Sequence, residues 1–170
     1  FLKVIKKKNN KIKKIGLKFT IPHKDKKDIR YNKSLGGGAY YDCGCYLFKF
    51  LSSISNKENT KYKKIRFKFS KKFRIDTYGV LNTQINKMKV NLEWGLGLKY
   101  ENNIVIEFKD KKIASADRFF SKNFNETPTI KIYDQKKAGI KLKKFQKQNH
   151  FFNMFEYFYK LKNNKKMREN

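Results

Sequence analysis

Three consecutive glycines, Gly36, Gly37 and Gly38, constrain the fold of this chain more than any other feature of its sequence. Glycine tolerates positive φ and close approach of a ligand or another backbone, so the triplet marks a point where side chains do not fit. The apolar residues that follow recur at roughly the three- and four-residue spacing of a buried helix face: Ala39, Cys43, Tyr46, Leu47, Phe50 and Leu51. We therefore expect a glycine-led helix that ends near Ser53.

Asp42 and Tyr46 lie four residues apart near the start of this expected helix. At that spacing two side chains share one face of an α-helix, one turn apart. A carboxylate and a phenol placed together form a candidate pair for acid–base chemistry. Each also has an ordinary structural explanation, because Asp42 could cap the helix start and Tyr46 could be a core aromatic residue.

Alternating apolar residues indicate strands along most of the chain. The alternation begins at Ile15–Ile21 and recurs near residues 65–69, 77–86, 90–98, 102–108, 113–117, 129–133 and 140–145. A helical apolar stripe closes the chain at residues 149–162. Strands joined by short turns and flanked by helices predict an α+β fold with an open, mostly antiparallel β-sheet and helices packed on one face.

The formal charge of +29 raises the question of nucleic-acid binding, because such an excess attracts phosphate backbones. Of the 43 basic residues, however, only five are Arg, the residue best suited to bidentate phosphate and base recognition. The chain is also rich in Asn, Ile, Phe and Tyr, which share A/T-rich codons with Lys. We attribute the charge to genomic composition and predict no specific nucleic-acid partner.

Several other classes of protein have little support in the sequence. No apolar stretch approaches eighteen residues, so no membrane partner is predicted. The two cysteines, Cys43 and Cys45, would point apart on a helix and are expected to be small buried residues in a reducing cytoplasm. His23 and His150 lie far apart with no cysteine pair near them, so no metal site is expected.

The segment around the glycines resembles the opening helix of the C-terminal domain of the Gfo/Idh/MocA oxidoreductases, whose pattern is approximately R-x5-GGGAL-x-D-x-G-x-Y/H. The matching elements are Arg30, the run from Gly36 to Ala39, Asp42, Gly44 and Tyr46. Residues 9–22 look like the first strand of that domain, and residues 92–120 resemble a stretch of the nucleotide-sugar 3-ketoreductases in the family. The resemblance covers about residues 9 to 160.

This resemblance implies that residues 9–170 form a substrate-binding and oligomerisation domain. Residues 1–8 would be the end of a helix from a missing N-terminal Rossmann-type domain that binds most of the NAD or NADP. The whole protein would be a cytoplasmic NAD(P)-dependent oxidoreductase that acts on a sugar or nucleotide-sugar by hydride transfer, as a homo-oligomer through its sheet. As a fragment without the cofactor domain, the chain is not expected to be active alone.

The resemblance also assigns roles to residues. Tyr46 falls where the family has a Tyr or His that exchanges a proton with the substrate oxygen, and Asp42 matches an Asp near the substrate. The three glycines would let the helix start approach the nicotinamide or the substrate. Arg30 and Arg118 could hold a diphosphate or a carboxylate, and surface ion pairing would explain each of them equally well.

Two other interpretations stay open at this point: a non-catalytic binding protein of the same fold, and a basic nucleic-acid-binding domain. An E-K-P motif and a dinucleotide-binding glycine fingerprint upstream of Phe1 would favour the enzyme. The lysine of E-K-P, which in the family assists the phenol, matches no lysine of this chain.

Overall fold

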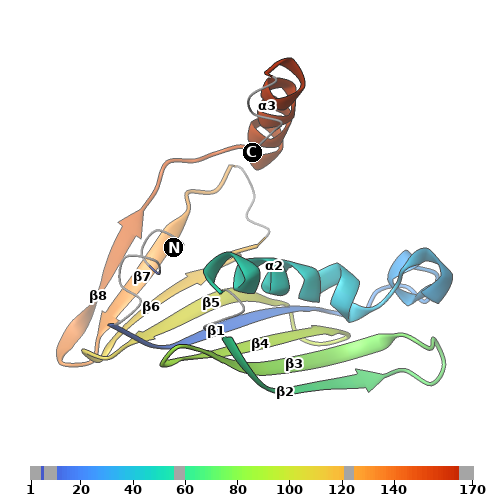
Figure 1. Cartoon of the computed structure of the whole chain (residues 1–170), viewed down its shortest axis with the longest axis horizontal. Helices are drawn as coiled ribbons and strands as arrows, with labels where there is room; N and C mark the ends of the chain where they lie inside the picture. The colour runs from blue at the N-terminus through green and yellow to red at the C-terminus, as the bar shows by residue number, and fades with distance from the viewer. Residues whose placement is uncertain (1–4, 6–10, 56–59, 121–124, 165–170) are drawn as a thin grey trace.

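The computed structural model describes residue 5 and residues 11–55, 60–120 and 125–164. Its main element is an eight-stranded sheet with the strand order β2-β3-β4-β1-β5-β6-β7-β8 (Figure 1). The strands are β1 (Ile12–Ile21), β2 (Thr60–Phe69), β3 (Asp76–Ile85), β4 (Met88–Leu96), β5 (Glu101–Phe108), β6 (Lys112–Asp117), β7 (Thr129–Asp134) and β8 (Lys137–Lys144). The helical elements are η2 (Ile29–Tyr31), η3 (Lys33–Leu35), η4 (Tyr40–Gly44), α2 (Cys45–Ile54) and α3 (His150–Asn163).

All neighbouring strands pair antiparallel except β1 and β4, which pair parallel. After the helices the chain enters the sheet at its edge strand β2, and the hairpins β2–β3 and β3–β4 bring it back to β4 beside β1. Strand β5 pairs with β1 on its other side. In the parallel register Leu17 lies beside Leu92 and Phe19 beside Trp94, so the apolar residues of both strands line the same face. The predicted α+β class with an open, mostly antiparallel sheet is confirmed.

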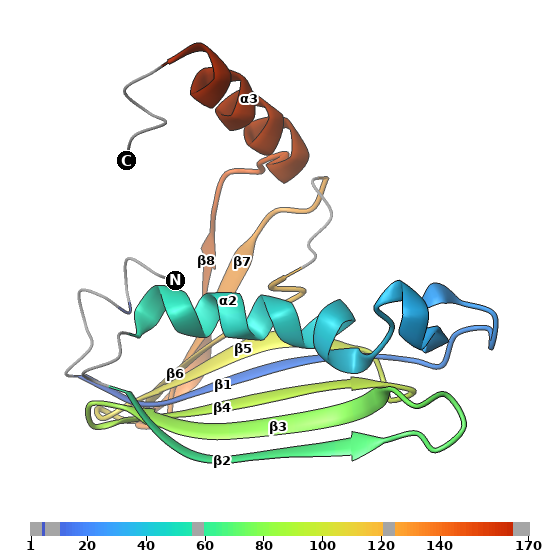
Figure 2. The ribbon, with the colours of Figure 1, turned by 45° about the vertical axis from the view of Figure 1, so that its right-hand side comes forward.

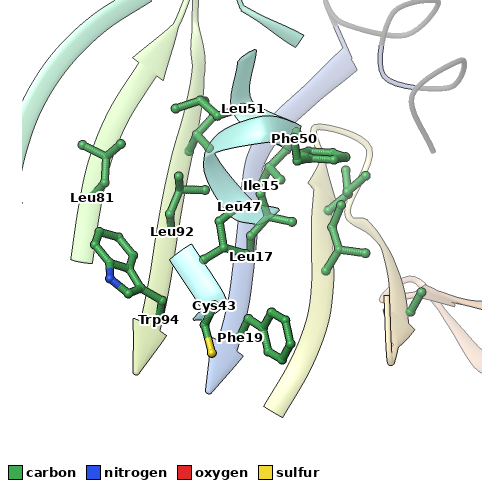
Figure 3. Close-up of a cluster of buried hydrophobic side chains, with 14 of the residues drawn as sticks. Ile15, Leu17, Phe19, Cys43, Leu47, Phe50, Leu51, Leu81, Leu92 and Trp94 are labelled. Carbon is green, nitrogen blue, oxygen red and sulfur yellow. The ribbon is translucent and has the colours of Figure 1, made fainter. Parts of the chain in front are cut away.

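The core lies between that face of the sheet and α2, as Figure 3 shows. Helix α2 contributes Leu47, Phe50 and Leu51, all buried, and the sheet contributes the alternating residues of its central strands. Full burial of each such side chain contributes roughly 1.5–3 kcal/mol to stability. The described elements leave the opposite face of the sheet uncovered (Figures 1 and 2).

Helix α3 confirms the helix predicted for residues 149–162. It stands beyond the ends of β7 and β8 (Figure 2), and its aromatic side chains are exposed, with Phe155 and Phe158 each at 66%. The predicted helix end at residues 1–8 lies outside the described residues, apart from Ile5, whose side chain is buried in the core.

Candidate functional site

The glycine triplet forms a tight loop that closes on its own backbone. Gly37 donates its N–H to the carbonyl oxygen of Asn32 at 2.8 Å, and Gly38 donates to that of Arg30 at 3.0 Å. A Cβ on Gly37 would lie 2.6 Å from the Arg30 oxygen and 2.7 Å from the Asn32 oxygen. Gly38 has a φ of +133°, which side chains strongly disfavour. Both features expected of the triplet are therefore present: Gly38 has a positive φ, and another group lies close to Gly37. At Gly37 that group is the backbone of the same chain.

The helix after the glycines begins differently from the prediction. Residues 40–44 form a π-helical turn, η4, before α2 continues as a regular α-helix to Ile54. A π-turn closes on the fifth residue instead of the fourth. Asp42 therefore lies in the π-turn and Tyr46 in the α-helix that follows it, so the one-turn spacing of a regular α-helix does not apply to this pair.

The Asp42 carboxylate pairs with Arg30. Its Oδ2 atom accepts a hydrogen bond from Arg30 Nε at 2.8 Å, and Arg30 Nη1 also contacts both oxygens of Asp28 at 3.1 Å. The Asp42 interaction is the largest cause that raises the pKa of Arg30, and the Arg30 backbone N–H lowers the pKa of Asp28. Arg30 and Asp42 are separate candidates in the sequence, and the structure brings them together as an ion pair.

Tyr46 lies at the start of α2 on an aromatic surface. Its ring centroid is 5.6 Å from that of Phe19 on β1 and 6.3 Å from that of Phe120, which follows β6. The Tyr46 side chain is 48% exposed, and its hydroxyl makes no hydrogen bond to another described residue. Tyr46 therefore lies at the edge of the core. Its ring packs against apolar side chains, and its hydroxyl is accessible to a ligand.

Arg118 belongs to a different part of the surface. It follows β6 with a φ of +49°, and its Nη1 atom pairs with Glu126 Oε1 at 2.6 Å. It borders a cavity of about 280 Å³ whose walls are largely apolar: Ala116, Phe119, Pro128, Ile130 and Phe145, with Asp117 and Thr129. Among the described residues it makes no contact with the Arg30–Asp42 pair. The two arginines thus lie at separate places.

Asp76, which sequence analysis did not single out, is the residue that caps the helix start. Its Oδ2 atom accepts the backbone N–H of Tyr40 at 2.7 Å. Burial raises the pKa of the Asp76 carboxyl, and the hydrogen bond from Tyr40 opposes that rise. The indole N–H of Trp94 also lowers the pKa of this carboxyl. It is buried, and it makes no hydrogen bond to a described residue. No local pattern marks this aspartate, because its partner lies 36 residues earlier in the chain.

The two cysteines differ from the prediction that both are buried. Cys43 is fully buried and Cys45 is exposed, and both are free thiols. Burial is the main cause that raises the pKa of the Cys43 thiol, with a further contribution from Asp42. Within the described ranges no group of three or more His, Cys, Asp or Glu is placed to hold a metal ion, and no helix there is long and apolar enough to cross a membrane.

Comparison with known proteins places the fold. No family model and no curated protein sequence matches the chain. Among solved structures, KijD10, a 3-ketoreductase from Actinomadura kijaniata in complex with NADP and TDP-benzene, matches with a TM-score of 0.83 at 18% identity, over 94% of this chain and 49% of that one. A mutant of the same enzyme with a tyrosine replaced by phenylalanine gives a TM-score of 0.79 at 17% identity over the same shares.

A second enzyme has a related fold. The aldose-aldose oxidoreductase from Caulobacter crescentus, complexed with glycerol, matches with a TM-score of 0.63 at 12% identity, over 87% of this chain and 43% of that one. The chain thus spans about half the length of the enzymes it resembles. It has the fold of the matched half of these oxidoreductases, as its resemblance to the C-terminal domain of the Gfo/Idh/MocA oxidoreductases predicted.

Proposed function

We propose that this chain is the substrate-binding part of an NAD(P)-dependent oxidoreductase that acts on a sugar or nucleotide-sugar by hydride transfer. The fold shared with a 3-ketoreductase bound to NADP and TDP-benzene supports the class of reaction and of substrate. The observation that carries the proposal is Tyr46, a half-exposed phenol whose ring packs against Phe19 and Phe120. It lies near the start of the helix that η4 and α2 form together, which we call the motif helix. Residues 9–170 would form the C-terminal domain of that enzyme.

The cofactor would be held mainly outside this chain. The space beside Gly37 is filled by the carbonyl oxygens of Arg30 and Asn32, so a dinucleotide cannot approach the backbone at that glycine. The sequence also lacks the G-x-G-x-x-G fingerprint. When bound, NAD(P)H would supply the hydride. The glycine-led helix start would face the reacting end of the cofactor or the substrate from the other side.

Tyr46 would supply or take up the proton. A carbonyl that gains a hydride becomes an alkoxide, and a positioned acid lowers that barrier. The apolar contacts with Phe19 and Phe120 fix the ring, while the hydroxyl makes no hydrogen bond to a described residue that would compete with the substrate. A cation supplied from outside this chain would assist the phenol, because a nearby positive charge favours its ionised form.

The other candidate residues would bind and orient the substrate. Arg30 holds Asp42 through Oδ2, and Oδ1 accepts no hydrogen bond from a described residue, which leaves it for a sugar hydroxyl. Arg30 is already paired with the carboxylates of Asp28 and Asp42. In our proposal it contacts the substrate beside Asp42 while it keeps these partners. Arg118, on the border of the apolar cavity, would hold an anionic group at a second place.

We also propose that the protein is a cytoplasmic homo-oligomer that associates through the uncovered face of the sheet. On that face Lys18 lies between Glu93 at 3.0 Å and Glu101 at 2.7 Å, and Asn91 donates to Asn82. Because these polar groups are paired within the chain, burying them against a second copy leaves few unsatisfied. Sedimentation of a monomer at high micromolar concentration would contradict this proposal.

The test of the main proposal is Tyr46→Phe in the full-length enzyme. The substitution keeps the ring and its contacts and removes only the acid. We expect kcat and kcat/KM to fall together by roughly 10²–10⁴, because the lost interaction is made in the transition state. The thermal melt should not change. Tyr41→Phe, which alters an exposed tyrosine in the adjoining turn η4, is the matched control and should leave turnover unchanged. Normal turnover by Tyr46→Phe would refute the proton-transfer role.

A further inference from the structure

The helix that carries Asp42 starts without a cap from its own sequence. The residue before its first turn is Ala39, which has no side-chain acceptor, and η4 has no local cap. The first N–H groups of a helix need an acceptor from elsewhere. The N–H of Tyr40 finds it in Oδ2 of Asp76, the first residue of β3. A strand of the sheet thus supplies the cap for the motif helix.

The surroundings of the Asp76 carboxylate fit this role. A Cβ on Gly38 would collide with Oδ1 of Asp76, so only glycine at this position leaves room for the carboxylate. The buried N–H of Trp94 has no hydrogen-bond partner among the described residues, and its indole favours the charged form of Asp76. The last glycine of the triplet and the aspartate are therefore matched to each other across 38 positions of sequence.

Asp76 is itself held in place by the turn between β2 and β3. Ser70 donates its N–H to the Ile75 oxygen and Arg74 donates to the Ser70 oxygen, both at 2.9 Å, and Ile75 is buried. Phe73 in this turn packs against Tyr31 of the loop before the glycines, with ring centroids 4.8 Å apart. The turn therefore contacts the glycine loop on one side and, through Asp76, the helix start on the other.

We propose that Asp76 is a positioning residue: through the Tyr40 amide it fastens the start of the motif helix to β3 and so fixes where Asp42 and Cys43 lie. This anchoring stands on the contacts alone, whereas its consequence for catalysis rests on the proposed function. Asparagine at this position keeps an acceptor of the same shape without the charge, while alanine removes the acceptor. The two substitutions should therefore differ sharply.

Cys43 gives a direct readout of the anchoring. It is fully buried in η4, next to Asp42, and its thiol should react with a thiol reagent only when the helix start opens. In a Cys45→Ser background it is the single thiol of the chain. Asp76→Ala should raise the labelling rate of Cys43 about tenfold, in line with the usual effect of deleting a helix cap. Asp76→Asn should stay within about threefold of the parent.

Thr83→Ala is the matched control for a general loss of stability. Thr83 is buried on the same strand, and its hydroxyl donates to the Lys61 oxygen at 3.0 Å, far from the helix start. If Asp76→Ala and Thr83→Ala accelerate Cys43 labelling equally at equal loss of stability, the effect is global and the proposal is wrong. An unchanged rate in Asp76→Ala overturns it as well.

A measurement on the unsubstituted chain covers the case in which Asp76→Ala does not fold. Hydrogen exchange should show the Tyr40 amide protected, because its N–H is bonded to Asp76. Rapid exchange of this amide would overturn the anchoring. Neither labelling nor exchange uses the enzyme activity, so these results are independent of Tyr46→Phe and of the proposed reaction.

Discussion

Substitution of Gly37 by alanine should destabilise the chain more than the same substitution at Gly36 or Gly16, where a Cβ would meet nothing within 4 Å. The new Cβ would lie 2.6 and 2.7 Å from two backbone oxygens, and backbone cannot rotate away as a side chain can. Overpacking of this kind costs about 1–3 kcal/mol, and the hydrogen bond from Gly37 to Asn32 is worth about 1 kcal/mol. The loss of freedom in the unfolded chain returns about 0.4–1 kcal/mol. The net expectation is a loss of about 2 kcal/mol.

Two other glycines separate the steric cause from the conformational one. Gly36 has a φ of +75° and open space around its Cβ position, so Gly36→Ala should cost about 1 kcal/mol through backbone strain alone. Gly16 in β1 has open space and no positive φ, so Gly16→Ala should be neutral or stabilising by about 0.5 kcal/mol. Urea unfolding at constant m-value measures all three. If Gly37→Ala is as stable as Gly16→Ala, the tight loop does not exist as described.

Two further expectations concern ligands. Calorimetric titration of NADPH into the 170-residue chain should show no micromolar binding, because the chain has no dinucleotide fingerprint; micromolar affinity would mean that the cofactor site lies within this domain. Binding to DNA should be weak, indifferent to sequence and lost as salt rises, because counterion release would drive nearly all of it; an oligonucleotide that stays bound at high salt would contradict the oxidoreductase assignment.

The strands were predictable because the alternation of apolar and polar residues that marks each strand lies within the strand's own sequence. One face of the sheet is covered and the other is open, so apolar and polar residues alternate along β1, where Ile15, Leu17 and Phe19 all point into the core. The parallel pairing of β1 with β4 was not predictable from this pattern. Alternation shows which face of a strand is buried, and it contains no information on which strand lies beside it.

The helices show the same division. The spacing of Leu47, Phe50 and Leu51 was sufficient to predict α2, since these residues fill the core. The spacing gave no sign of the π-turn before it, whose last residue, Gly44, lies close against Trp94 of β4, where a Cβ would be 3.2 Å from the indole. Helix α3 was predicted from its aromatic stripe, yet the same stripe gave no sign that Phe155 would be exposed.

The sequence names candidate site residues one by one, but the contacts between them were not predictable from it. Asp42 was a candidate for capping its own helix, but its carboxylate pairs with Arg30 and the cap comes from Asp76. The fold brings both pairs of residues together from separations of 12 and 36 residues along the chain. The sequence motif identifies candidate functional groups. The contacts that orient these groups come from elements outside the motif. For this chain those elements are the loop before the glycines and the first residue of β3, so a substitution in either one should disturb the motif without touching it.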